Sequence, residues 1–387
     1  MSLSVDAILH ESTIYGRREK LIRMADGLEL GDVYGGTIER IKAQAGDKSR
    51  LGMAALMWIS HAERPLEADE LCHALAVKLG FTYFNNKNVP LISTLVSSCQ
   101  GLVTVDKEAT TVRFIHFTLQ EYLATHPDVF SRPHSVIAEI CLAYLNSRQD
   151  RALSAASTLG ARGAQFLSYC SVYWEVHAKR ELSNYAISLA VELLKEDYGE
   201  VSTELLLGWV PNLDIWGFYP RSPFNGLHCA SFFGIVEVVV TLIEIECYDI
   251  NGGDFMGYTP LARATRNGYE VVVKLLVGRE EVNSDVPGTA GRTPLLHAAD
   301  GGHVGVAEML LGWGEVNPNV TDNYDRTPFS YAAQAGREGV VRRLLKREEV
   351  NPGVADSYGR TPLPHAAGGG SGWWWNYYSN GERQTPT

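Results

Sequence analysis

Residues 293–302 read TPLLHAADGG, and this stretch returns along the chain at a constant interval. Related segments are GLHCASFFG after Asn225, TPLARATRNG from Thr259, TPFSYAAQAG from Thr327 and TPLPHAAGGG from Thr361, each 34 residues from its neighbour. Two columns are invariant across the five units: Ala230, Ala264, Ala298, Ala332 and Ala366, then Gly234, Gly268, Gly302, Gly336 and Gly370. Such a period is typical of stacked repeat proteins, which bind partners over extended surfaces.

Each unit predicts a helix, a tight turn, a second helix and a long polar loop. Thr-Pro begins the first helix, because threonine accepts hydrogen bonds from free N–H groups and proline needs no donor there. The small alanines let the first helices of neighbouring units approach closely. The glycine ends the first helix, because glycine adopts a left-handed conformation without strain. The second helix has an apolar stripe, as in VVVKLLV at 271–277.

This unit resembles the ankyrin repeat, whose T-P-L-H-x-A-A and later V-V-x-x-L-L signatures are nearly intact. The resemblance implies an α-solenoid of four full units and a half unit over 216–370, with the finger loops and first helices as the binding surface. The first unit carries Asn225-Gly226 in place of Thr-Pro. The repeat pattern ends at Gly370, and an irregular tail, 371–387, rich in tryptophan and tyrosine, follows it. The tail is either an aromatic docking segment or a ragged end that packs loosely on the fourth unit.

Composition favours a globular protein that does not bind nucleic acid. The 387 residues carry a formal net charge of −11, and binding to a phosphate backbone requires clustered lysine and arginine. The apolar stretches are far shorter than the ~20 residues of a membrane span, and no signal peptide is recognisable. Six scattered cysteines without a C-x-x-C pair indicate buried thiols. We therefore expect a cytoplasmic protein with no membrane partner.

The chain before the repeats is also mostly helical. Helical patterns lie at 49–65, 67–80 and 89–102, followed by two short strands within 102–117 and a helix at 117–126. Three helices, a β-hairpin and a flanking helix predict a winged-helix domain at 46–127. Segment 1–45 is weakly patterned, with one helix at 28–41. A helical bundle or linker is expected at 128–215, with a loop at 148–163 rich in Ala, Ser and Gly.

Winged helices often bind DNA, and in such proteins the third helix would contact the bases. That helix offers Ser93, Thr94, Ser97, Ser98 and Gln100 but no cation. The wing carries Lys107 and Arg113 against Asp106 and Glu108. A helix without lysine or arginine is poorly suited to bind in a DNA groove, so we expect no nucleic-acid partner.

Together these blocks resemble the part of fungal NACHT–ankyrin proteins that follows the ATPase module. These are NLR-like members of the signalling ATPases with numerous domains. The resemblance rests on LGDVYGGTIERI, LGMAALMWISHAERPLEADELCHAL, TVRFIHFTLQEYL and FLSYCSVYWEVHAKREL. It implies signal transduction, with a winged helix that closes over the nucleotide of a NACHT module and repeats that bind partners. The histidine that contacts the ADP phosphate in related receptors matches His116.

A phosphate cradle requires G-x-x-x-x-G-K-[S/T], because loop N–H groups and a lysine must converge on the phosphates. This motif does not occur in the sequence, so 1–45 is at most a remnant of a NACHT module. His116 would bind a nucleotide only if a NACHT module were supplied. Otherwise we expect it to pack at the junction of the wing and the following helix.

No other motif predicts chemistry. The eleven histidines show no metal-ligand spacing, and neither a G-x-S-x-G elbow nor a convincing carboxylate pair is present. We therefore expect a non-enzymatic protein without catalytic residues, cofactor or metal.

The predicted binding surface consists of finger tips and exposed positions of the first helices. Its candidate residues are Phe255, Met256, Tyr258, Arg266, Asn267, Arg292, Asp300, Asn323, Tyr324, Arg326, Gln334, Ser357, Tyr358 and Arg360. Arginine and tyrosine dominate the energetics of interfaces. A Tyr/Arg ridge (Arg292, Tyr324, Arg326, Tyr358 and Arg360) would contact an acidic or mixed protein surface. Alternatively, each arginine bonds the finger of the neighbouring unit.

The sequence thus favours a protein-recognition scaffold that is part of, or derived from, a NACHT-type signalling protein. Two alternatives stay open. The chain is a nucleotide-dependent switch subunit that works with a NACHT module in trans, or it is a degenerate fragment without a retained role.

Overall fold

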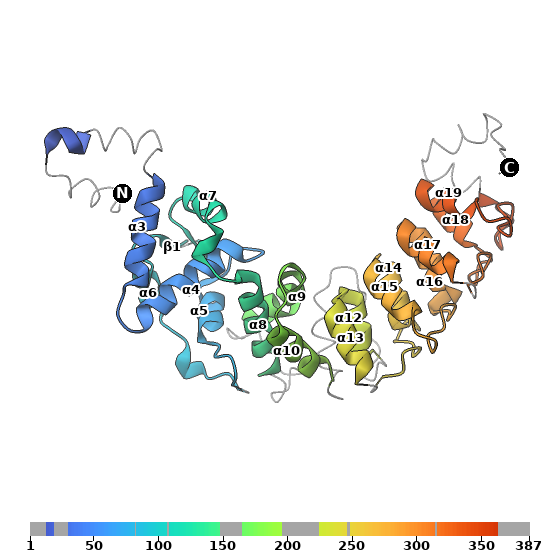
Figure 1. Ribbon diagram of the computed structural model, residues 1–387, viewed down its shortest axis with the longest axis horizontal. Coiled ribbons are helices and arrows are strands. Elements are labelled where there is room, and N and C mark those ends of the chain that lie inside the picture. Colours follow the sequence, from blue (N-terminus) through green and yellow to red (C-terminus); the bar gives the residue numbers. More distant parts are fainter. Residues whose placement is uncertain are drawn as a thin grey trace. The chain divides into compact units, whose positions relative to one another are not determined.

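The computed structural model describes residues 13–18, 30–81, 83–106, 108–147, 165–195, 224–245, 248–313 and 316–362. These residues are mostly helical and fall into two compact units that divide after Leu189 (Figure 1). The fold class predicted from sequence, a winged helix followed by an ankyrin solenoid, is confirmed. The predicted loop at 148–163 and the aromatic tail at 371–387 lie outside the described residues, as do Lys107 and Gly370.

The first unit begins with the winged helix. Its elements are α3 (Leu30–Lys42), α4 (Asp47–His61), α5 (Ala68–Ala76), η1 (Asn86–Asn88), α6 (Ile92–Ser98), β1 (Val103–Val105), β2 (Val112–Phe114) and α7 (Phe117–Thr125). The two strands pair antiparallel, with Thr104 opposite Arg113. Asp106 closes the wing by accepting hydrogen bonds from the N–H groups of Glu108 and Ala109, and these bonds lower the pKa of its carboxyl group.

Three further helices follow, after the short turn η2 (Pro127–Val129). They are α8 (Pro133–Asn146), α9 (Gln165–Arg180) and α10 (Asn184–Lys195). Their aromatic residues form a core with α4. Trp58 of α4 is fully buried, and its ring meets the edges of Phe166 and Tyr169 at centroid distances of 5.8 and 5.7 Å. Tyr144, Phe166, Tyr169 and Trp174 are thus core residues, as their helical spacing indicates, whereas Tyr185 of α10 is exposed.

The second unit contains the repeats as successive helix pairs (Figure 1). The pairs are α12 (Gly226–Phe233) with α13 (Val236–Glu244), α14 (Pro260–Arg266) with α15 (Glu270–Val277), α16 (Pro294–Gly301) with α17 (Val304–Gly312), and α18 (Pro328–Gln334) with α19 (Glu338–Leu344). The first helices pack on one another through the fully buried Ala230, Ala264, Ala298 and Ala332. The fifth unit is described only through Thr361 and Pro362.

The ends of the first helices follow the predicted chemistry except at Thr293, whose hydroxyl makes no capping hydrogen bond and has no partner among the described residues. Thr259 and Thr327 accept hydrogen bonds from the N–H groups three residues on, and Asn225 performs the same role in the first unit. The glycine column is left-handed, with φ between 67° and 79° at its four described members. A Cβ atom on Gly268 would also lie 2.4 Å from the imidazole of His303, so the column serves both the turn and the close packing that follows it.

The long loops are tied together by a column of side chains. Asn251 accepts a hydrogen bond from the N–H of Asn283 (2.8 Å) and donates to the carbonyl of Glu281 (2.6 Å). Asn319 repeats both bonds with Asn351 and Glu349. Between them the column holds Asp285, whose Oδ2 accepts from the N–H of Asn317 (3.1 Å). Its buried Oδ1 has no hydrogen-bond partner among the described residues, because a carboxylate cannot donate as an amide does.

We expect Asp285→Asn to stabilise the repeats at neutral pH by about 0.5–1 kcal/mol, the net value of one added hydrogen bond. Burial raises the pKa of Asp285 above 3.8, so the folded protein favours the protonated carboxyl group. The stability that protonated Asp285 gives the fold is fully present below the unfolded-state pKa, and it is lost as pH rises through the folded-state pKa. Urea unfolding at neutral and acidic pH tests this. The gain should shrink on acidification, and a pH-independent gain would contradict the assignment.

Candidate protein-binding surface

The finger loops are folded by a column of buried aspartates. We define the fingers as residues 251–258, 285–292, 319–326 and 353–360, and the first, third and fourth contain Asp254, Asp322 and Asp356. Each of these carboxylates accepts hydrogen bonds from the N–H groups two and four residues on, at 2.8–3.0 Å. Each aspartate N–H also donates to the carbonyl four residues on. The aspartate thus braces the backbone of these three fingers, and the second finger makes the same backbone bond from Gly288 to Arg292 without an aspartate.

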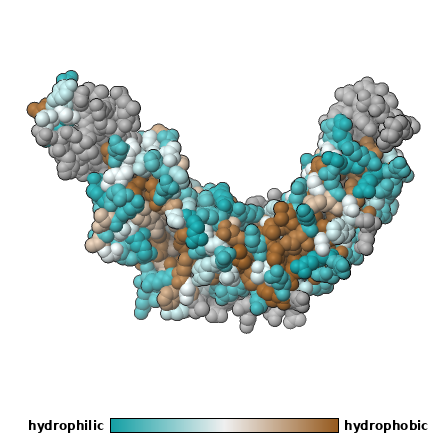
Figure 2. Space-filling model, in the orientation of Figure 1, coloured by the Kyte–Doolittle hydropathy of each residue, from teal (hydrophilic) through white to brown (hydrophobic). Residues whose placement is uncertain are grey.

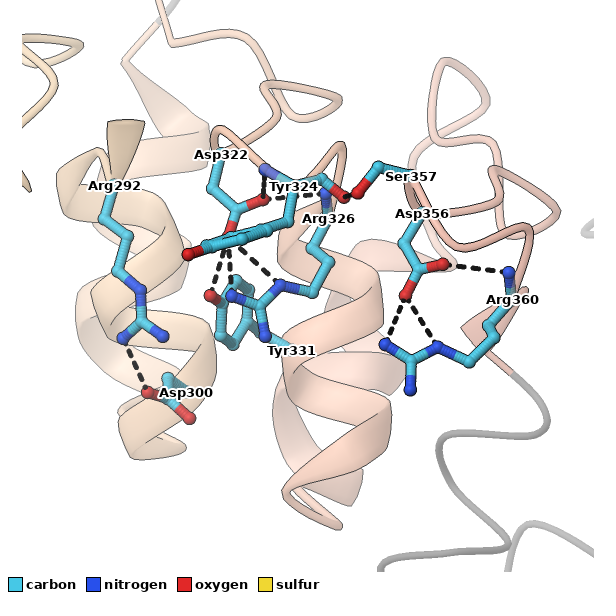
Figure 3. Close-up of polar contacts among 9 residues, drawn as sticks. All are labelled: Arg292, Asp300, Asp322, Tyr324, Arg326, Tyr331, Asp356, Ser357 and Arg360. Carbon is cyan, nitrogen blue, oxygen red and sulfur yellow. Dashed lines mark hydrogen bonds and ion pairs between the residues drawn. The ribbon is translucent and has the colours of Figure 1, made fainter. Parts of the chain in front are cut away.

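The same carboxylates bind the arginines that end the fingers. Arg326 donates to Asp322 through Nε and Nη2 at 3.1 and 2.8 Å, and Arg360 pairs with Asp356 at 3.0 Å (Figure 3). Burial alone would raise the pKa of Asp322, but the N–H groups and side chains that bond it hold this pKa below its usual value. These two arginines thus pair within their own finger, and the expectation that they bond a neighbouring finger is wrong.

The second finger has Gly288 where the others have aspartate. Arg292 therefore lies against Asp300 of the following helix, α16, at 3.3 Å, and above the ring of Tyr331 at 4.5 Å. Arg326 lies over the same ring at 4.5 Å, and the Tyr331 hydroxyl donates to Asp322 (Figure 3). Burial and this hydrogen bond raise the pKa of Tyr331 to about 12. The arginines of the Tyr/Arg ridge are all neutralised by aspartates.

The first finger differs because its aspartate pairs inward. Asp254 binds Arg263 of α14, and the side chains of both residues are almost fully buried. The Arg263 guanidinium lies 4.9 Å from the ring centroid of Tyr258 and 5.5 Å from that of Phe255. Tyr258 itself is 6% exposed. Its predicted role as a tip contact does not fit this burial, whereas Phe255 and Met256 stay partly exposed.

Two of the remaining candidate residues form hydrogen bonds within the repeat stack, and others are exposed to solvent. Asn267 donates to the carbonyl of Phe232 at 2.7 Å, which joins adjacent first helices. The Ser357 hydroxyl donates to the carbonyl of Tyr324 at 3.1 Å, which joins adjacent fingers. The exposed candidates are Arg266, Asn323, Gln334, Ser357, Arg360, Tyr324 (44% exposed) and Tyr358 (69% exposed). Over α16–α19 the visible face of the stack is mostly hydrophilic (Figure 2).

Sequence reasoning missed the aspartate column, although its signal was present. Asp322 and Asp356 are 34 residues apart, and Asp254 lies two periods before Asp322. An acidic residue two positions before a tip and four before an arginine fits an Asx-type turn followed by an ion pair. The sequence analysis considered the tip residues without the aspartates that precede them. It therefore did not predict that the ridge arginines are neutralised.

His116 lies at the start of α7 and is exposed. Its Nδ1 is 3.0 Å from the Thr118 hydroxyl, and its ring stacks on Phe117, which is 70% exposed. The expectation that His116 packs at the junction of the wing and the helix is therefore wrong. The wing's Arg113 pairs with Asp106 at 3.0 Å.

These observations define the class of protein: a winged-helix domain followed by ankyrin repeats, which are non-catalytic modules for protein–protein interaction. Family comparisons agree with both parts. Residues 38–141 match the winged helix domain of GPI inositol-deacylase, and residues 227–322 and 295–372 match ankyrin repeats (3 copies). No curated protein matches the chain. Among the described residues, no helix has the length and apolar character needed to cross a bilayer.

Proposed function

We propose that this protein is a non-enzymatic recognition scaffold, and that the exposed tips of its third and fourth fingers bind a protein partner. The observation that carries the proposal is the exposure of Tyr324 and Tyr358 on equivalent tips. The guanidinium carbons of Arg326 and Arg360 lie 5.0 and 4.8 Å from these rings, so each ring is supported from within its finger. Ordered, exposed tyrosines are favourable contacts because little conformational entropy is lost when they bind.

The ion pairs also change the kind of partner that fits. Arg326 and Arg360 are held by buried aspartates, and Arg292 is held by Asp300. The ridge therefore offers aromatic faces and polar groups with nearly balanced charge. A partner with a mixed polar and apolar surface fits this better than a strongly acidic one. The exposed Arg266 and Gln334 extend the same surface onto the first helices.

The test is the double substitution Tyr324→Ser with Tyr358→Ser in the full chain. Each ring packs on the arginine of its own finger, and serine keeps the backbone N–H that bonds the buried aspartate, so the fold should be retained. Loss of one hot-spot residue should weaken binding about thirtyfold, since such a residue contributes roughly 2 kcal/mol or more, and loss of both should weaken it further. Binding is measured on a partner captured by the wild-type chain. The arginines are left in place, because their removal would leave buried carboxylates unpaired.

Val271→Ser is the matched control, because Val271 is 61% exposed and lies on the second helix α15. It should leave binding unchanged. Equal binding by the wild type and the double variant, with both folded, would exclude the tips as the contact surface.

We further propose that the chain acts in the cytoplasm as part of, or derived from, a NACHT-type signalling protein. The exposed His116 supports this interpretation, because an imidazole at the start of a helix beside the exposed Phe117 is available to a second module.

In the alternative of a nucleotide-dependent switch, His116 would contact a nucleotide held by a NACHT module. The chain alone should then bind no ADP or ATP in calorimetry, and tight binding by the isolated chain would contradict the scaffold proposal. If neither a partner nor a NACHT module is found, the chain is a degenerate fragment.

A further inference from the structure

Three metal-ligating side chains converge in the first unit from distant parts of the sequence. Glu63 follows α4, His134 is the second residue of α8, and His177 lies in the last turn of α9. One ligand atom from each residue lies within 4.8 Å of the other two. The Nδ1 atoms of the two histidines are only 2.8 Å apart. These residues are separated by 71 and 43 positions, so no local spacing in the sequence could reveal them.

The surrounding groups orient these side chains. The Tyr169 hydroxyl lies 2.9 Å from Nε2 of His177 and accepts a hydrogen bond from the N–H of Glu63 at 3.2 Å. The carboxylate of Glu63 is held by Arg180. A phenol behind one imidazole and a guanidinium behind the carboxylate are the kind of supporting contacts that fix metal ligands.

We propose that Glu63, His134 and His177 form a binding site for a divalent transition-metal ion, with Zn²⁺ as the best match. Zinc binds imidazole nitrogen and carboxylate oxygen at roughly 2.0–2.2 Å, so tetrahedral ligand atoms lie about 3.3–3.5 Å apart. The Nδ1 atoms of His134 and His177, 2.8 Å apart, are closer than this value, so small side-chain rotations would have to separate them to admit the ion. Two histidines and one glutamate leave the fourth position to water or to His61, whose ring centroid is 5.4 Å from that of His134.

The contacts of His177 leave Nδ1 as its ligand atom, because its Nε2 lies 2.9 Å from the Tyr169 hydroxyl. With Nδ1 of His177 on the metal, its Nε2–H would donate to the Tyr169 oxygen. The charged groups facing the site are Arg180, which holds Glu63, and Glu181, which accepts from the N–H of Ser135 at 3.2 Å.

The bound metal would join three segments: the connection after α4, the start of α8 and the end of α9. Because the ligands come from separate helices, the ion would stabilise their packing, as structural zinc sites do. The site lies within the first unit and is independent of the proposed binding by the finger tips.

Co²⁺ is the probe, because in a tetrahedral site it reports its ligands through visible absorption, and Zn²⁺ then competes for the site. The full chain is stripped with a chelator and titrated with Co²⁺. We expect one tetrahedral Co²⁺ per chain, displaced by Zn²⁺, and a rise in the melting temperature of the first unit with Zn²⁺. A folded wild-type chain without the tetrahedral spectrum would overturn the proposal.

His134→Gln and Glu63→Gln test the ligand assignment. Both residues are only partly buried, so both variants should fold, as circular dichroism can verify. Each should weaken metal affinity at least about tenfold, because loss of a hydrogen-bonding partner behind a ligand already has that effect. His73→Gln is the matched control, since His73 lies in the same unit and bonds the carbonyl of Asp69. Affinity retained by both ligand variants would show that the metal binds elsewhere.

Discussion

Arg263→Ala is expected to lower the free energy of unfolding of the repeat unit by about 3–5 kcal/mol. The Arg263 side chain is 2% exposed and that of Asp254 is fully buried, and Nε donates to Oδ2 at 2.5 Å. Removing the guanidinium would leave the Asp254 carboxylate in a low-dielectric site, where its remaining hydrogen-bond partners among the described residues are the N–H groups of Met256 and Tyr258. The aromatic rings around the guanidinium would also lose a partner.

Local hydrogen exchange, followed by mass spectrometry, is the measurement, because the two units need not unfold together. Amides of α14 and α15 should exchange faster in Arg263→Ala, whereas those of α8 and α9 should not change. Arg279→Ala is the control, since Arg279 is 40% exposed and lies 4.0 Å from Glu281. Such a pair contributes at most about 1 kcal/mol. A loss of similar size in both variants would contradict the importance of the buried pair.

Trp58→Ala should lower the free energy of unfolding of the first unit by about 3–5 kcal/mol, the range for large aromatic residues removed from a core. Trp58 is fully buried and joins α4 to Phe166 and Tyr169 of α9. Its indole N–H has no acceptor among the described residues. Trp58→Phe therefore loses packing but no hydrogen bond, and should have a clearly smaller effect.

Unfolding by urea, with exchange of the α8 and α9 amides as the local probe, measures both substitutions. Phe117→Ala is the matched control in the same unit, because an exposed aromatic residue is expected to change stability by no more than about 0.5 kcal/mol. Equal losses for Trp58→Ala and Phe117→Ala would show that this core does not hold the unit together.

Most of the fold could be predicted because its determinants are local and repeated. Thr259 and Thr327 cap helices, and Gly234 and Gly268 end them, for reasons that one unit contains in full. The winged helix was also predicted correctly, because three helical patterns, two alternating strands and a further helix follow one another in the sequence. Cysteine burial also followed from the pattern: all described cysteines are buried, and burial raises the pKa of Cys72 to about 11.

The candidate surface was only partly predictable, because it depends on pairing across several residues. Tyr324 and Tyr358 were chosen as tips and are exposed. Tyr258 occupies an arginine position of the column, yet it is buried because Arg263 and Asp254 draw the first finger inward. Which carboxylate each arginine binds depends on whether an aspartate or Gly288 lies four residues before it in the same finger. A tip residue taken by itself does not carry that information.

The convergence of Glu63, His134 and His177 could not be predicted from the sequence. Their proximity depends on how α8 and α9 pack beside the end of α4, a tertiary contact with no local pattern. The same argument applies to His116, because a position in the sequence does not determine which face of a helix start is covered.

Site-specific photo-crosslinking tests the central claim most directly. A photoreactive phenylalanine analogue replaces Tyr358 in the full chain, and in a second protein it replaces Val271, which has nearly the same exposure. Both are expressed in the cells that make the protein naturally, and adducts are identified by mass spectrometry. We predict a discrete protein adduct from position 358 that is absent from position 271. No adduct from 358, or the same adducts from both positions, would contradict recognition by the finger tips.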